Sequence, residues 1–104
     1  MSPGAFRLVI EPEVEAEIAE AVEWYESRER GLGRKFIRAF ASATAKLRRN
    51  PFLYQIVEEE ARRLLLRRFP YAVFYEIYDL EVVVIACLHE AQDPGIWHQR
   101  LSRR

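Results

Sequence analysis

The chain has 104 residues, half of them apolar, and its 16 basic and 16 acidic side chains cancel to a net charge of zero. This length fits one compact domain, residues 1–104, and the zero net charge favours neither a nucleic acid nor an acidic surface as partner. The lone cysteine, Cys87, excludes an intramolecular disulfide and a multi-cysteine metal site. Because it lies in an apolar run, we expect an inert, buried thiol.

The charges are nevertheless segregated along the chain. Seven glutamates and no basic residue lie between Glu11 and Glu26, whereas six basic residues and no acidic one lie between Arg34 and Arg49. A third cluster is made of arginines alone: Arg62, Arg63, Arg67 and Arg68. We therefore expect separate acidic and basic faces, which steer charged partners toward particular surfaces.

The first half of the chain predicts a strand and a helical hairpin. Residues 5–10 are apolar and partly β-branched, which favours a strand, and Pro12 suits the first turn of a helix over residues 12–29. Gly31 and Gly33 end that helix. A second apolar stripe at helical spacing then runs to Asn50-Pro51, where the proline stops it. The short link makes the two helices antiparallel neighbours.

The second half predicts a sheet. Residues 51–60 have the composition of a loop, residues 62–67 that of a strand, and residues 68–70 that of a turn. The two strongest strands, residues 71–78 and 82–88, are joined by a turn at Asp79-Leu80. Alternation should place Val73, Tyr75 and Ile77 on one face and Phe74, Glu76 and Tyr78 on the other. We expect the hairpin to cover one of these faces and the other to be partly open. The resulting order, β-α-α-β-β-β, predicts an α+β fold whose antiparallel sheet carries a two-helix hairpin on one face.

Other classes of protein find no support in the sequence. No apolar run approaches the roughly 20 residues that span a bilayer, and no convincing signal peptide precedes the first strand. We therefore expect a cytoplasmic protein without membrane contacts. His89 and His98 lie nine positions apart, and no ligand spacing indicates a metal site or a cofactor.

The last third carries a recognisable pattern. It contains Phe69, Pro70, Tyr71 and Tyr75, followed by His89, Asp93, Pro94, Trp97 and Arg100. With these residues the chain resembles the ParE branch of the RelE/ParE superfamily, the plasmid-stabilisation toxins of type II toxin–antitoxin modules. The resemblance covers nearly the whole chain and implies the fold predicted above. One position departs, because Gln92 stands where that branch usually has arginine, which puts full toxicity in question.

Two activities are associated with this superfamily, and a fold alone does not choose between them. The resemblance to the ParE branch implies a toxin that binds and poisons DNA gyrase without a catalytic site. The alternative is a RelE-like, ribosome-dependent mRNA endonuclease, in which Arg67 or Arg68 would hold the phosphate, His89 would carry a proton and Tyr75 or Tyr78 would lie nearby. RelE-like nucleases generally have a basic residue in the middle strand where this chain has Ala72. The third alternative is a degenerate, non-toxic relative that still binds an antitoxin.

Several residues have a functional and a structural interpretation. We expect the arginine cluster to contact the target or a partner, although charged side chains also protect strand edges. Asp93-Pro94 is typical of a turn, His89 of a structural histidine at a strand end, and Trp97 of packing between tail and sheet. The candidate contact residues are Arg62, Arg63, Arg67, Arg68, Trp97 and Arg100, with Arg103 and Arg104 beyond them at the C-terminal end.

The resemblance also implies partners. A cognate antitoxin would wrap its C-terminal segment around the hairpin and a sheet edge, and an acidic segment would suit the basic patches. DNA gyrase is the expected target and the ribosome with its mRNA the alternative, whereas we expect no sequence-specific DNA binding by this chain alone.

Overall fold

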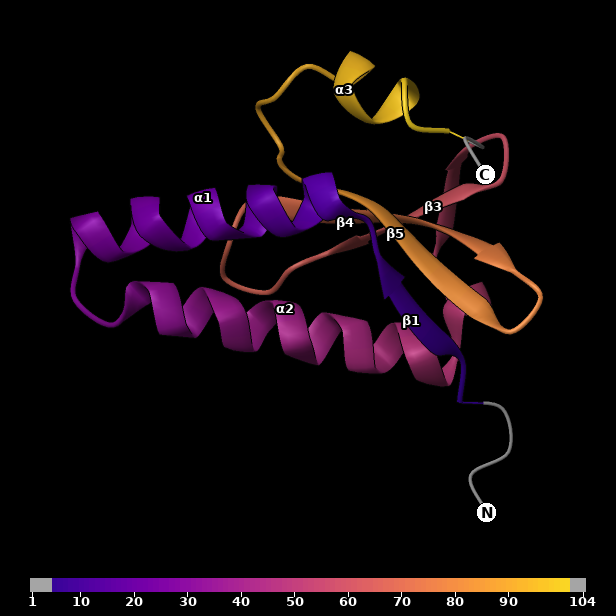
Figure 1. The fold of residues 1–104 in the computed structure, drawn as a ribbon, viewed down its shortest axis with the longest axis horizontal. Coiled ribbons are helices and arrows are strands. Elements are labelled where there is room, and N and C mark those ends of the chain that lie inside the picture. The colour runs from indigo at the N-terminus through magenta and orange to yellow at the C-terminus, as the bar shows by residue number, and fades with distance from the viewer. Residues whose placement is uncertain (1–4, 102–104) are drawn as a thin grey trace.

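The computed structural model describes residues 5–101 and contains a five-stranded sheet with two long helices (Figure 1). The elements follow in the order β1 (Arg7–Ile10), α1 (Pro12–Arg28), α2 (Leu32–Arg49), a 3₁₀ turn η1 (Pro51–Leu53), β2 (Gln55–Glu58), β3 (Ala61–Leu65), β4 (Tyr71–Tyr78), β5 (Glu81–His89) and α3 (Gly95–His98). None of the helices among residues 5–101 is both long and apolar enough to cross a bilayer.

The strand order in the sheet is β1-β5-β4-β3-β2. Neighbouring strands are antiparallel except for β1 and β5, which are parallel. The helical hairpin carries the chain from β1 at one edge of the sheet toward β2 at the other edge. The pairing of β1 with β5 ends at Ile10 and Val84, so the second half of β5 has no strand on that side. The predicted α+β class, with a helical hairpin on a largely antiparallel sheet, is confirmed.

The prediction of a loop over residues 51–60 is wrong. This segment contains η1 and the edge strand β2, which pairs with β3 through a tight turn where Glu59 has a φ of 51°. The strand is short and bulged and ends at the charged Glu58, features that are common in edge strands. Its two apolar residues, Ile56 and Val57, are adjacent, so it shows little of the apolar alternation that marks a buried strand. The next strand, β3, ends at Leu65, which places Arg67 in the following turn.

The link between α1 and α2 depends on glycine and on a carboxylate. Gly31 adopts a φ of 90°, a backbone conformation that glycine accepts readily. A Cβ atom at Gly33 would lie 2.9 Å from the carbonyl oxygen of Val22, so only glycine lets the helices approach this closely. Glu26 accepts the N–H groups of both glycines, with the Gly31 bonds foremost in lowering its pKa. The predicted helix boundary thus has a steric cause.

Both faces of the sheet are covered. The alternation predicted for β4 is correct, since Val73, Tyr75 and Ile77 belong to the core beneath the hairpin. The opposite face was predicted to be partly open, and this is wrong, because the tail with α3 lies over it (Figure 1). Trp97 stacks on Phe74 with 4.6 Å between ring centroids, which confirms that this tryptophan packs the tail onto the sheet.

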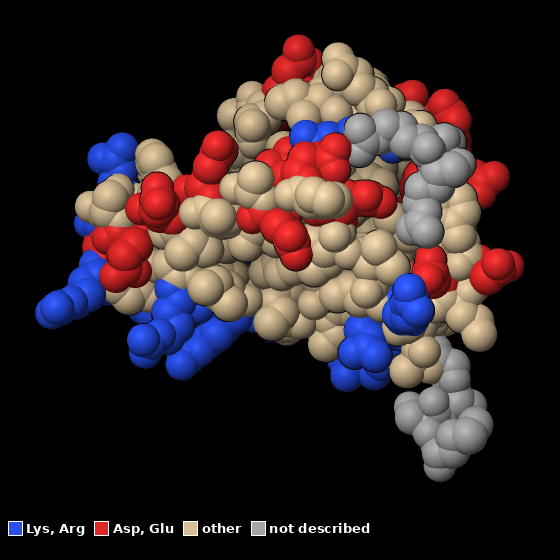
Figure 2. Space-filling model, viewed as in Figure 1, with Lys and Arg blue, Asp and Glu red and all other residues tan. Residues whose placement is uncertain are grey.

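The charge segregation seen in the sequence becomes a division between the two helices. Figure 2 shows acidic side chains gathered over α1 and basic ones along the lower edge, over α2. The two helices lie side by side, so the hairpin is acidic along one side and basic along the other. Any partner that binds both helices of the hairpin therefore contacts surfaces of both negative and positive electrostatic potential.

Candidate functional site

The four clustered arginines do not form one patch. Arg62 and Arg63 alternate on β3 and so lie on opposite faces of the sheet. The Arg62 guanidinium donates to the carbonyl oxygens of Phe52 and Tyr54, at 3.0 and 2.7 Å, and lies over the Phe52 ring. Arg62 thereby holds η1 against the sheet edge. Arg63 lies in a small hollow on the tail side that His89 and Trp97 also line.

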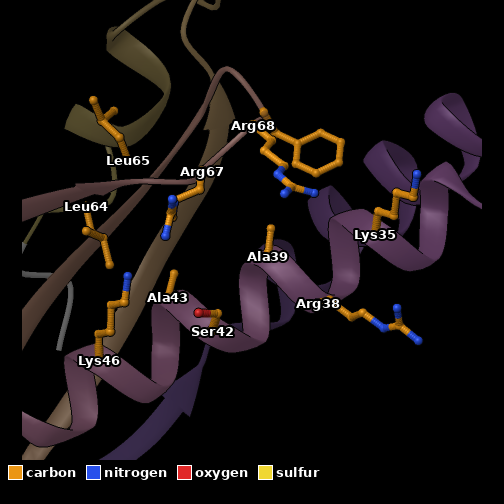
Figure 3. A pocket seen from close by; sticks show the side chains of 11 residues that line it. Lys35, Arg38, Ala39, Ser42, Ala43, Lys46, Leu64, Leu65, Arg67 and Arg68 are labelled. Atoms are coloured by element: carbon orange, nitrogen blue, oxygen red, sulfur yellow. The ribbon is translucent and has the colours of Figure 1, made fainter.

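The other two arginines join α2 in a basic groove of about 390 Å³ (Figure 3). Its cationic residues come from both walls: Lys35, Arg38, Lys46, Arg67 and Arg68. No acidic residue of the described range 5–101 lines it, and its apolar surface comes from Ala39, Ala43, Leu64, Leu65 and Phe69. None of the five cations forms an ion pair within residues 5–101. We call this feature the basic groove.

Two of these cations face one another. Lys46 from α2 and Arg67 from the turn after β3 reach into the groove from opposite walls, whereas Arg38 extends away from it (Figure 3). Arg68, at the next position, adopts a φ of 73°, which is uncommon for a residue with a side chain. Like charges placed opposite each other repel, and an anion between them removes the repulsion. The basic groove is therefore suited to carboxylates or phosphates.

Sequence reasoning missed the part of the basic groove that α2 supplies. Lys35, Arg38, Ser42 and Lys46 follow one another at three- and four-residue intervals. On a helix this spacing places them along one stripe. The signal was therefore present in the sequence, but only the pairing of α2 with the turn after β3 joins that stripe to Arg67 and Arg68.

Arg100 lies in a different environment. It forms an ion pair with Glu17 at 2.7 Å, and the two side chains are 14% and 17% exposed. A second nitrogen of the guanidinium donates to the carbonyl oxygen of Ile85, and Glu17 accepts the N–H of Cys87. These two backbone groups belong to the part of β5 that β1 leaves unpaired. The Glu17–Arg100 pair thus satisfies two backbone groups that a neighbouring strand would otherwise pair at that edge.

The three residues considered for nuclease chemistry are not brought together. Tyr75 is fully buried beneath the hairpin, and its hydroxyl donates to the carbonyl oxygen of Pro51 at 2.6 Å. Burial raises the pKa of Tyr75 far above its ordinary value, against a smaller lowering by Arg62. His89 lines two hollows beside the tail, whereas Arg67 lines the basic groove.

The short turn after β5 explains how the chain accommodates Gln92. The backbone N–H of His89 donates to the Gln92 side-chain oxygen at 2.8 Å, and the N–H of Gln92 donates to the carbonyl oxygen of His89. The Nδ1 atom of His89 accepts the N–H of Ala91 at 3.0 Å. Glutamine at this position therefore closes the turn and ties down the histidine without any cation.

Cys87 is expected to resist alkylation in the native protein. Burial, followed by the nearby charge of Glu17, raises the pKa of its thiol to about 12. At pH 8 only about one thiol in ten thousand is then the reactive thiolate. Iodoacetamide labelling followed by mass spectrometry should be slow in buffer and complete quickly in denaturant. Rapid labelling of the folded chain would contradict the buried position.

The described residues offer no metal centre, since no three of their histidine, cysteine or acidic side chains gather in a way that could hold an ion. Arg103 and Arg104, which the sequence suggested as contact residues, lie outside the described residues.

Comparison with solved structures identifies relatives that share the fold. A chain from the chromosomal ParDE TA system of P. aeruginosa superposes with a TM-score of 0.73 at 12% identity, covering 83% of this chain and 97% of that one. A mutant of the E. coli toxin RelE in the free state gives a TM-score of 0.64 at 13% identity, with 95% and 97% covered. This chain therefore shares its fold with both structures.

The family follows from the sequence. The family described as "ParE toxin of type II toxin-antitoxin system, parDE" matches residues 8–94. This chain belongs to the ParE toxin family, as the resemblance of its last third predicted. No curated protein sequence matches it significantly.

Proposed function

We propose that this chain is a toxin that inhibits DNA gyrase and that a cognate antitoxin neutralises it by laying an acidic segment in the basic groove. Membership of the ParE toxin family supports the role of toxin. Gyrase inhibition requires binding alone, and the burial of Tyr75 favours it over a nuclease mechanism. The proposed target also places the action of the chain in the cytoplasm.

The position of Tyr75 is the single observation on which that choice rests. A phenol that is 0% exposed, with its hydroxyl already donated to Pro51, has no access to an RNA substrate. The Phe74 face of the sheet, on the side away from the hairpin, is also covered by Trp97. A nuclease would need either surface to open before it could position a phosphate and a proton carrier together.

The basic groove supports the role proposed for the antitoxin. Its apolar surface and the unpaired cations that reach into it match an amphipathic segment with leucines on one side and glutamates on the other. We propose that Arg67 and Arg68 also contact the target, so that the antitoxin masks the toxic surface. Three other predicted contact residues have the structural contacts described above: Arg62, Trp97 and Arg100. Arg63 lines only the small hollow on the tail side, and we rank all four below Arg67 and Arg68.

Expression in a bacterial host tests the proposed target. We expect filamentation and induction of a DNA-damage reporter, with translation continuing during the first minutes. The His89→Ala variant should be as toxic as the unchanged chain, because no proton carrier is required. An arrest of translation before any DNA-damage signal, or loss of toxicity in His89→Ala with the variant folded, would instead identify an mRNA nuclease. Absence of any growth effect would indicate a non-toxic relative.

A further inference from the structure

A second concave feature lies on the opposite, acidic side of the hairpin. It is a cleft of about 330 Å³ between α1 and the ends of β4 and β5. Aromatic side chains form much of its wall: Trp24, Tyr25, Tyr71 and His89. Glu17 and Glu20 also line it, whereas no lysine or arginine from residues 5–101 does so. We call it the acidic-aromatic cleft.

The rings follow one another around the wall. Trp24 and Tyr25 meet edge to face at 5.0 Å, Tyr25 and Tyr71 lie 6.1 Å apart, and Tyr71 meets His89 at 5.2 Å. Burial, together with smaller effects of Tyr25, Cys87 and Glu20, raises the pKa of Tyr71, so its ring stays neutral. The faces of neutral aromatic rings attract cations, most strongly where water is partly excluded.

The two carboxylates differ in what they can still bind. Glu17 is committed, because its oxygens take the Arg100 guanidinium and the N–H of Cys87. Glu20 forms no ion pair within residues 5–101. The cleft therefore combines one uncompensated carboxylate with an aromatic wall, and its charge is complementary to a cation.

We propose that the acidic-aromatic cleft receives a single arginine side chain from a partner protein. Its volume, near the lower end of the roughly 300–1,000 Å³ of small-ligand sites, suits one side chain. A planar guanidinium stacks on aromatic rings and pairs with a carboxylate at the same time, which an ammonium group does less well. The chain's own Arg28 makes a contact of this kind, since its guanidinium lies 4.4 Å from the centre of the Trp24 ring.

This site is independent of the gyrase proposal, since it requires only the folded chain. It also differs in sign from the basic groove, so a partner that occupied both would carry an acidic segment and an arginine at opposite sides of the hairpin. The arginine would fix the register of that partner on α1.

A titration of the full chain with N-acetyl-arginine amide, followed by ¹H–¹⁵N NMR, tests the proposal. We expect saturable shifts of the Trp24 indole and of the amides around Glu20, Tyr71 and His89, with millimolar affinity. The uncharged N-acetyl-norleucine amide should give no saturable shift. Glu20→Gln should weaken binding of the arginine amide about threefold, the size expected for one exposed ion pair.

Glu23→Gln is the matched control, because Glu23 is exposed on the same helix but does not line the cleft. It should bind the arginine amide as the unchanged chain does. Equal binding of the norleucine amide, equal loss in both variants, or shifts confined to other surfaces would each overturn the proposal. The NMR spectra themselves report whether Glu20→Gln remains folded.

Discussion

Replacing Arg100 by alanine is expected to lower the free energy of unfolding by about 3 kcal/mol. Breaking one member of a buried ion pair commonly costs about 3–5 kcal/mol, and the partial exposure of this pair places it near the lower end. The loss has two parts: Glu17 is left as an unpaired carboxylate beside the core, and the carbonyl oxygen of Ile85 loses its donor. Urea denaturation followed by circular dichroism measures it.

The surface ion pair between Arg7 and Glu81 provides the control. Arg7 is 77% exposed and its side chain lies 3.2 Å from that of Glu81. Surface pairs are worth less than about 1 kcal/mol, so Arg7→Ala should leave the denaturation midpoint almost unchanged. Equal effects of Arg7→Ala and Arg100→Ala would show that the Glu17–Arg100 pair does not hold the tail on β5.

The second large effect is expected at the basic groove. The double variant Lys46→Glu/Arg67→Glu should weaken binding of a glutamate-rich amphipathic helical peptide by about 100-fold. Each charge reversal removes an attraction of about 0.5–1 kcal/mol and adds a repulsion of about the same size. Both side chains reach into the groove, from opposite walls, so both reversals act on the bound peptide. Fluorescence anisotropy of a labelled peptide measures the change, and raising the salt concentration should shrink it.

A control of equal net charge separates local from general electrostatics. Arg30 and Arg49 are exposed and do not line the basic groove. The variant Arg30→Glu/Arg49→Glu should therefore bind the peptide within a few fold of the unchanged chain. Similar losses in the two double variants would mean that the peptide responds to total charge and not to this groove.

The sequence was most informative where local patterns suffice. Periodicity located both helices and the two central strands, and the alternation in β4 correctly separated Val73 and Tyr75 from Phe74. It failed at β2, because this edge strand has only four residues and its two apolar side chains, Ile56 and Val57, are adjacent and do not alternate with polar ones. The covered second face was also missed, since it depends on a long-range contact between Trp97 and Phe74.

In the candidate site, too, local patterns were predicted and long-range contacts were not. Arg67 and Arg68 stood out in the sequence and line the basic groove, but Arg62 and Arg63 are neighbours whose side chains lie on opposite faces of a strand. Arg100 was predicted as a contact residue, but the structure shows it in an ion pair with Glu17. Nothing in the sequence around Arg100 indicates this pairing with a residue so distant in the chain. Spacing finds stripes on single elements, whereas grooves and buried ion pairs arise from how the elements pack.

The most direct test of the proposed function uses purified components. The chain is added to DNA gyrase and supercoiled plasmid, and in parallel to a cell-free translation reaction in which mRNA length is followed. The account predicts inhibited supercoiling with accumulation of cleaved plasmid, relieved by the antitoxin, while the mRNA stays intact. Cleaved mRNA in the presence of unimpaired gyrase would contradict it.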